Sequence, residues 1–110
     1  MEDFDKLNKY SNTAALYDGK HGIVRLHKTN IVEFTDECGG RTIKLDSGGW
    51  RTSTTKKRIN EVFSALGIDC MVYQDKKQWF VSCHNGDIQY RDGIVLTNAI
   101  GSPNVAVVSR

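Results

Sequence analysis

The sequence predicts an α+β fold: an antiparallel β-meander, then one central amphipathic helix packed on the sheet, then β-hairpins. Three observations support this prediction. Short β-rich runs separated by turn residues fill the first half of the chain, one stretch with helical periodicity follows, and more β-rich runs come after the glycine that ends it. Because 110 residues is the length of one ordinary domain, we expect residues 1–110 to form a single domain.

Residues 1–12 are the first candidate element. They are polar and charged, but Phe4, Leu7 and Tyr10 recur at helical spacing. Few other apolar side chains could anchor this segment, so we expect either a weak helix or a loose arm.

Three β-rich runs form the predicted meander. Residues 22–27 and 31–35 are joined by a connection of hairpin length that contains a turn-favouring asparagine, so the two runs should pair antiparallel. After a turn signal, residues 41–45 alternate polar and apolar side chains and should add a third strand.

The helix is the most clearly marked element. Its apolar face follows the i, i+3, i+4, i+7 rule in Ile59, Val62, Phe63 and Leu66, and Gly67 supplies the stop. We therefore predict a helix from residue 55 onward that packs this face on the sheet.

Polar side chains surround the start of this helix. Ser53 or Thr54 can act as the N-cap, Lys57 faces outward on the helical wheel, and Lys56 and Arg58 flank the apolar stripe. We therefore expect the basic end of the helix to face solvent.

The second half of the chain contains further β-rich runs with turn signals between them, at residues 70–73, 78–82, 88–90 and 93–96. We expect these runs to form a second meander. In the tail of residues 101–110, residues 105–108 should either add an edge strand or remain mobile.

Positive charge is concentrated near the centre of the chain. The net charge is +2, but residues 41–60 carry six Lys or Arg against one carboxylate, a local charge of +5. Residues 1–40 carry five against seven and residues 61–110 carry four against five, so both flanks are slightly acidic. A strong positive potential can therefore come only from the central segment.

This central segment contains the candidate binding site. Two glycines permit positive φ, an indole offers a flat face to a base, and cations follow in the first helical turn. Those cations oppose the helix dipole at about 0.3 to 1 kcal/mol each, so a phosphate or an acidic group would relieve them. The candidate residues for binding nucleic acid or an acidic partner are Gly48, Gly49, Trp50, Arg51, Thr54, Thr55, Lys56, Lys57 and Arg58.

A purely structural explanation of the same residues stays open. The glycine pair can make a tight turn, the cations can keep a small protein soluble, and Trp50 can fill the core beneath the helix. Because a tryptophan beside a helix start usually buries itself, we favour the core over a stacking surface for Trp50.

No motif indicates catalysis, a metal or a cofactor. The three histidines, His21, His27 and His84, lack metal-ligand spacing, and the glycine-rich segment lacks the spacing of a dinucleotide or phosphate loop. Three widely spaced cysteines fit neither a disulfide framework nor a zinc site, so we expect reduced, mostly buried thiols. We expect a protein that is not an enzyme.

Membrane insertion is not indicated either. No run approaches the roughly 18 apolar residues of a membrane span, and the first residues do not resemble a secretory signal. We therefore expect no membrane partner and a cytosolic location.

One block of the sequence is distinctive: Gly-Gly-Trp-x-Thr-x-Thr-Thr-Lys-x-Arg-Ile-Asn at residues 48–60. It is accompanied by the strings His27-x-Thr29-x-Ile31-Val32, Gln78-Trp79-Phe80-Val81 and Asp92-Gly93-Ile94-Val95-Leu96. Across residues 22–96 these strings resemble a family of small uncharacterised proteins encoded by tailed bacteriophages. The resemblance implies the cytoplasm of an infected bacterium as the setting, and it carries over no established activity.

Two functions of different classes fit these residues. The first, which the local charge slightly favours, is a nucleic-acid-binding protein that contacts phosphates through the helix start and the preceding loop. The alternative is a host-takeover factor that binds and modulates a bacterial protein through aromatic side chains, namely Tyr73, Trp79, Phe80 or Tyr90. A virion or assembly component is a third possibility. We expect a monomer or a homodimer paired through an edge strand.

Overall fold

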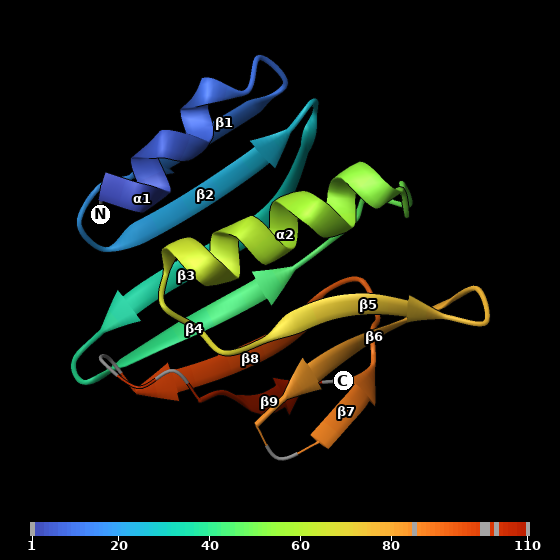
Figure 1. The fold of residues 1–110 in the computed structure, drawn as a ribbon. Coiled ribbons are helices and arrows are strands. Elements are labelled where there is room, and N and C mark those ends of the chain that lie inside the picture. Colours follow the sequence, from blue (N-terminus) through green and yellow to red (C-terminus); the bar gives the residue numbers. More distant parts are fainter. Residues whose placement is uncertain (1, 85, 100–101, 103, 110) are drawn as a thin grey trace.

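The computed structural model describes residues 2–84, 86–99, 102 and 104–109. Two antiparallel sheets and a 13-residue helix dominate it (Figure 1), with strand order β1-β2-β3-β4-β8-β9 in the larger sheet and β5-β6-β7 in the smaller one. The strands are β1 (Thr13–Tyr17), β2 (His21–Leu26), β3 (Thr29–Glu37), β4 (Gly40–Leu45), β5 (Met71–Asp75), β6 (Gln78–Cys83), β7 (Gly86–Gln89), β8 (Ile94–Ala99) and β9 (Ala106–Ser109). The helices are α1 (Glu2–Asp5), the 3₁₀ helix η1 (Lys6–Lys9) and α2 (Ser53–Ala65). The predicted α+β class is confirmed.

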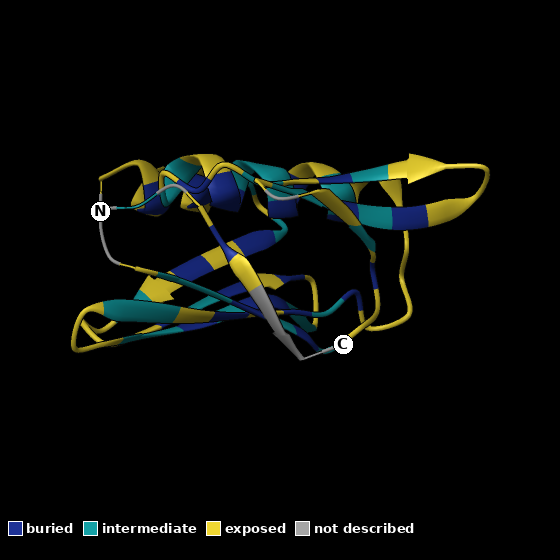
Figure 2. Cartoon of the chain, turned by 90° about the horizontal axis from the view of Figure 1, so that it is seen from below, coloured by how far each residue is buried: buried dark blue, intermediate teal, exposed yellow. Residues whose placement is uncertain are grey.

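Helix α2 and the β5–β6 hairpin form a layer that covers one face of the larger sheet (Figure 2). Asn60 holds the helix and the hairpin together, because its Oδ1 accepts the Val72 N–H at 2.7 Å and its Nδ2 donates to the Val72 carbonyl at 2.9 Å. The predicted apolar face of the helix is buried at Ile59, Val62 and Phe63. Burying each such side chain stabilises the fold by about 1.5 to 3 kcal/mol. The packing of these side chains in the core therefore determines the position of the helix, and of its first turn, relative to the sheet.

The N-terminal segment is a packed element, and the loose-arm alternative is wrong. Phe4 and Leu7, from α1 and η1, are both buried. The Phe4 ring meets the rings of Tyr17 and Phe34 edge-on, with centroids 6.5 and 5.5 Å apart. Strand β1 follows directly and was not predicted from the sequence, because its two alanines are weak strand formers and pairing with β2 decides its conformation.

The second half of the chain does not form the expected continuous meander. After β7 the chain leaves the smaller sheet, and β8 pairs antiparallel with β4 of the larger one. The Gly93 N–H donates to the Leu45 carbonyl at 2.8 Å where the two strands meet. Turn residues and the alternation of polar and apolar side chains locate strands, but they do not identify which strands pair. The sequence pattern therefore could not show that β8 pairs with β4. Strand β9 then pairs with β8 at the edge of the sheet, which confirms the edge-strand alternative for the tail.

Candidate functional site

The loop between β4 and α2 is held by polar contacts on its inner side. Gly48 and Gly49 both have positive φ, at 62° and 84°, and the Gly48 N–H donates to Asp46 Oδ1 at 2.7 Å. Ser47 is buried, and both its N–H and its hydroxyl donate to Asp92 Oδ1 at 2.8 Å. The loop is therefore tied to the segment before β8, far away in the sequence.

Asp92 is the charged centre of this anchor. Burial acts to raise its pKa, but the hydrogen bonds from Ser47 and from the Tyr90 hydroxyl outweigh burial, so the pKa lies below its ordinary value. The nearby Arg51 guanidinium acts in the same direction. At neutral pH Asp92 is therefore an anion that lies at the surface and accepts hydrogen bonds from Ser47 and Tyr90.

Trp50 lies on the surface, so the expectation that it fills the core is wrong. Its side chain is 70% exposed, whereas Trp79 is buried and packs on Tyr90 with ring centroids 5.4 Å apart. Trp79 and Tyr90 occupy the core beside the helix start, and the Ser47 anchor holds the loop outside it. A large exposed apolar side chain next to polar ones is more informative than a buried one, because it marks a surface able to bind something.

The cations of the candidate site have different surroundings. Arg51 lies over the rings of Tyr90 and Trp79, at 5.2 and 5.9 Å from their centroids, with its side chain still exposed. Lys56 is half-buried and donates to Gln74 Oε1 at 2.9 Å. Lys57 is exposed. Arg51 and Lys57 are therefore the cations of this segment most accessible to a ligand.

Arg58 is inside the protein and not on the basic surface. Its side chain is 7% exposed, and its Nε donates to the Thr13 hydroxyl at 3.0 Å. Its Nη1 lies 2.7 Å from Glu61 Oε1, and its guanidinium stacks 3.5 Å from the centroid of the Tyr10 ring. The Tyr10 hydroxyl donates to the other oxygen of Glu61 at 2.6 Å. Arg58 thus joins α2 to β1 and to the N-terminal segment.

The N-cap of α2 is Thr52, whereas Ser53 or Thr54 was predicted. Its hydroxyl accepts the Thr55 N–H at 3.2 Å, and its carbonyl accepts the Lys56 N–H at 3.2 Å. The Thr55 side chain is buried and donates to the Trp50 carbonyl at 2.9 Å, so it shapes the loop from inside. The N–H groups of Ser53 and Thr54 precede the first hydrogen bond within the helix and have no acceptor inside it.

A groove of about 560 Å³ lies between this loop and the turn that joins β2 to β3. Its lining includes the apolar side chains of Leu26, Ile31 and Trp50 together with the hydroxyls of Thr29 and Thr54. The loop and the turn approach closely, since a Cβ placed on Gly48 would lie 2.7 Å from the Thr29 side chain. Glycine at position 48 therefore allows the loop to approach Thr29 this closely.

His27 and Lys28 also line the groove, and sequence reasoning did not place them at the site. They form the two-residue turn between β2 and β3, where a three-residue connection at 28–30 was expected, and His27 has φ of 55°. Both side chains are exposed. The string that begins at His27 was part of the family resemblance, and this was the one sequence signal that could have drawn attention to the turn.

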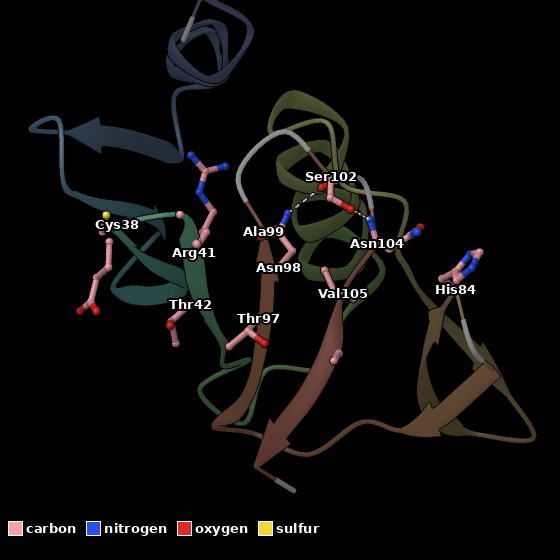
Figure 3. A pocket seen from close by; sticks show the side chains of 14 residues that line it. Cys38, Arg41, Thr42, His84, Thr97, Asn98, Ala99, Ser102, Asn104 and Val105 are labelled. Atoms are coloured by element: carbon pink, nitrogen blue, oxygen red, sulfur yellow. Dashed lines mark hydrogen bonds between the residues drawn. The ribbon is translucent and has the colours of Figure 1, made fainter.

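A second, shallower hollow of about 700 Å³ lies between the β3–β4 turn, which carries Cys38, and His84 (Figure 3). Arg41 at its wall is already paired with Asp36, through Nη2 and Oδ2 at 2.9 Å. Asn98 donates to the Ser102 carbonyl at 2.8 Å, and among the described residues no donor reaches its buried Oδ1. Of the lining residues that the structure describes, none is a tryptophan, tyrosine or phenylalanine, and the charged side chains have mixed sign.

The expectation of mostly buried thiols is wrong, because Cys38 is exposed and none of the three cysteines is fully buried. Cys70 and Cys83 are half-buried. Burial raises the pKa of the Cys70 thiol to about 12, and it also raises the pKa of Cys83. These two thiols are therefore protonated and weakly nucleophilic at neutral pH.

In the described part of the chain, no three His, Cys, Asp or Glu side chains come together as a potential metal site. Among the helices that the structure describes, none is long and apolar enough to cross a lipid bilayer.

Comparison with protein families shows a match to the family model described as Kyanoviridae Gp96 protein, over residues 3–97. The match includes the N-terminal segment, which lay outside the resemblance drawn from the sequence strings. Neither the curated proteins nor the solved structures contain a match to the chain.

Proposed function

This chain belongs to a family of phage proteins, the Kyanoviridae Gp96 proteins, and we propose that it binds nucleic acid in the infected bacterial cytoplasm. The proposed contact region is the Trp50 surface, which we define as His27, Lys28, Gly48, Gly49, Trp50, Arg51, Thr54 and Lys57. Thr55, Lys56 and Arg58 are left out of it, because their side chains are wholly or partly engaged inside the protein.

The observation that carries this proposal is the exposed indole of Trp50 among exposed cations. Lys28, Arg51 and Lys57 are all exposed. Trp50 is 70% exposed and lines the groove together with Lys28, and Arg51 follows it directly in the chain. Surfaces that hold nucleic acid combine positive charge for the phosphates with aromatic faces for the bases. Two acidic side chains touch this loop, Asp46 and Asp92, and each accepts hydrogen bonds from the loop itself.

The helix start adds to the positive potential. The first turn of α2 contains no acidic residue, so nothing on the helix offsets the positive end of its dipole. A phosphate placed there would meet the free N–H groups of Ser53 and Thr54 together with Lys57. Binding of an anion would therefore offset an unfavourable interaction of about 0.3 to 1 kcal/mol at Lys56, the lysine in the first turn of α2.

The alternative, a host-takeover factor, depends on exposed aromatic anchors in the second half of the chain. Trp79 and Tyr90 are buried, which leaves Tyr73 and Phe80, both half-buried and stacked on each other with centroids 5.5 Å apart. The hot spot of a protein interface needs an anchor that the partner can enclose. The exposed tryptophan lies instead with the cations, so we favour nucleic acid.

The test is a salt series of binding measurements by fluorescence anisotropy with labelled oligonucleotides. We expect log Kd to rise linearly with log salt concentration. Changing Lys28, Arg51 and Lys57 together to glutamine should weaken binding and reduce the magnitude of the slope by about 2 to 3, since each phosphate contact contributes about 0.7 to 0.9. Glutamine keeps most of the aliphatic part of each side chain, so a glutamine in place of Arg51 should still cover the Trp79 and Tyr90 rings.

The matched control changes three other exposed lysines, Lys6, Lys9 and Lys20, to glutamine. It alters the net charge by the same amount at the N-terminal segment and the β1–β2 turn. If both variants lose affinity equally, the net charge alone drives binding and the Trp50 surface has no special role. If the unaltered protein binds no oligonucleotide at low salt, the proposed function is wrong.

A further inference from the structure

We infer that the groove beside Trp50 accepts an unpaired nucleobase, so that the protein binds single-stranded nucleic acid in preference to duplex. This inference rests on the proposed function and names the class of substrate. It comes from the shape and lining of the groove, whereas the proposed function comes from the charges around it.

The size and lining of the groove suit one planar ring with polar edges. Its volume of about 560 Å³ lies within the range of about 300 to 1,000 Å³ that is usual for small-ligand pockets. Leu26 and Ile31 are buried and give it apolar contacts, and Trp50 adds an exposed aromatic face. Around them Asn12, Thr29 and Thr54 offer donors and acceptors for the edges of a base.

Charge complementarity selects an anionic ligand for this groove. Its lining contains Lys28 and His27 and no carboxylate. Thr54 lines the groove and belongs to the first turn of α2, so a phosphate next to a seated base would lie near the free N–H groups of the helix start. A nucleotide unit matches both parts, with its base in the groove and its phosphate at the helix.

The relative magnitudes favour an unpaired base. Stacking of a base on an aromatic side chain contributes about 1 to 3 kcal/mol. In a duplex both faces of each base are covered by neighbours, and taking one out of the stack costs a few kcal/mol. The gain from one tryptophan is therefore cancelled by that cost in a duplex, but it is kept in full in a single strand.

The experiment compares ligands of one length: a single-stranded DNA oligonucleotide, the same strand with abasic positions, and the blunt duplex. The single strand should bind roughly tenfold or more tightly than the abasic strand and the duplex. It should also quench the fluorescence of Trp50. In the Trp50→Ala variant the preference for the single strand over the abasic strand should shrink by roughly fivefold or more, since the variant keeps the charges but loses the stacking face.

The other outcomes separate the inference from the proposed function. Equal affinity for the single strand, the abasic strand and the duplex would overturn the inference and leave a charge-based nucleic-acid binder. Absence of binding to every ligand at low salt would overturn both. A free mononucleotide that binds as tightly as the oligonucleotide would show that the groove takes a soluble nucleotide, which contradicts the assignment to a strand.

Discussion

Replacing Arg58 by alanine is expected to lower the free energy of unfolding by about 2 to 3 kcal/mol. The change removes a buried guanidinium that contacts the Thr13 hydroxyl, the Glu61 carboxylate and the Tyr10 ring. It also removes the donor to the Thr13 hydroxyl oxygen and leaves the partly buried Glu61 carboxylate with the Tyr10 hydroxyl as its remaining donor. The full cost of breaking a buried ion pair is about 3 to 5 kcal/mol, but Glu61 keeps part of its exposure to water, so we expect a smaller loss.

Urea unfolding, followed by circular dichroism, measures this loss. The control is Lys57→Ala, one residue away on the same helix, where the side chain is exposed and the expected change stays within about 0.5 kcal/mol. A loss below about 1 kcal/mol for Arg58→Ala would mean that the guanidinium is in solvent and available to a ligand. Lysine at position 58 should not restore stability fully, because it cannot reproduce the planar contacts of the guanidinium.

Replacing Trp50 by alanine is expected to weaken binding of single-stranded nucleic acid by about 1 to 3 kcal/mol, or roughly five- to 150-fold. The unfolding free energy should change by no more than about 0.5 kcal/mol, because the indole is 70% exposed and fills no cavity. Anisotropy titrations and urea unfolding of the same preparation measure the two quantities.

Trp79 provides the matched control for this prediction. It is buried, so Trp79→Ala should cost about 3 to 5 kcal/mol of stability. Trp50→Ala should therefore lower the affinity for nucleic acid, whereas Trp79→Ala should lower the stability of the fold. Unchanged affinity in Trp50→Ala would show that the indole is not part of the interface.

Local patterns in the sequence predict the helix and the hairpins well. The spacing of Ile59, Val62 and Phe63 reports the buried face of α2, because an amphipathic helix must turn that stripe toward the core. A polar turn was expected at residues 74–77, and the structure has a tighter one of two residues, Lys76 and Lys77, both with positive φ. Such elements are determined by neighbouring residues and can be read from them.

The arrangement of the strands depends on contacts between distant residues, and the sequence pattern does not contain it. Strand β1 exists because β2 is present to pair with it, and β8 returns to β4 across a chain separation of about 50 residues. Neither pairing leaves a signature in composition or periodicity. The register of each strand follows from its partner.

The candidate site shows the same division between local and distant causes. The segment of residues 48–58 was identified from charge and glycine content, but the exposure of its side chains was assigned wrongly at two positions. Arg58 is buried because Thr13 and Tyr10 come from the N-terminal segment to meet it. Trp50 is exposed because Trp79, from the second half of the chain, occupies the core.

Backbone chemical shifts recorded during titration of ¹⁵N-labelled protein with a single-stranded oligonucleotide test the central claim most directly. The account predicts that amides of residues 27–29 and 48–57 shift and that those of β8 and β9 do not. Saturating shifts confined to another part of the surface, such as the hollow beside Cys38, would contradict the assignment of the Trp50 surface as the nucleic-acid interface.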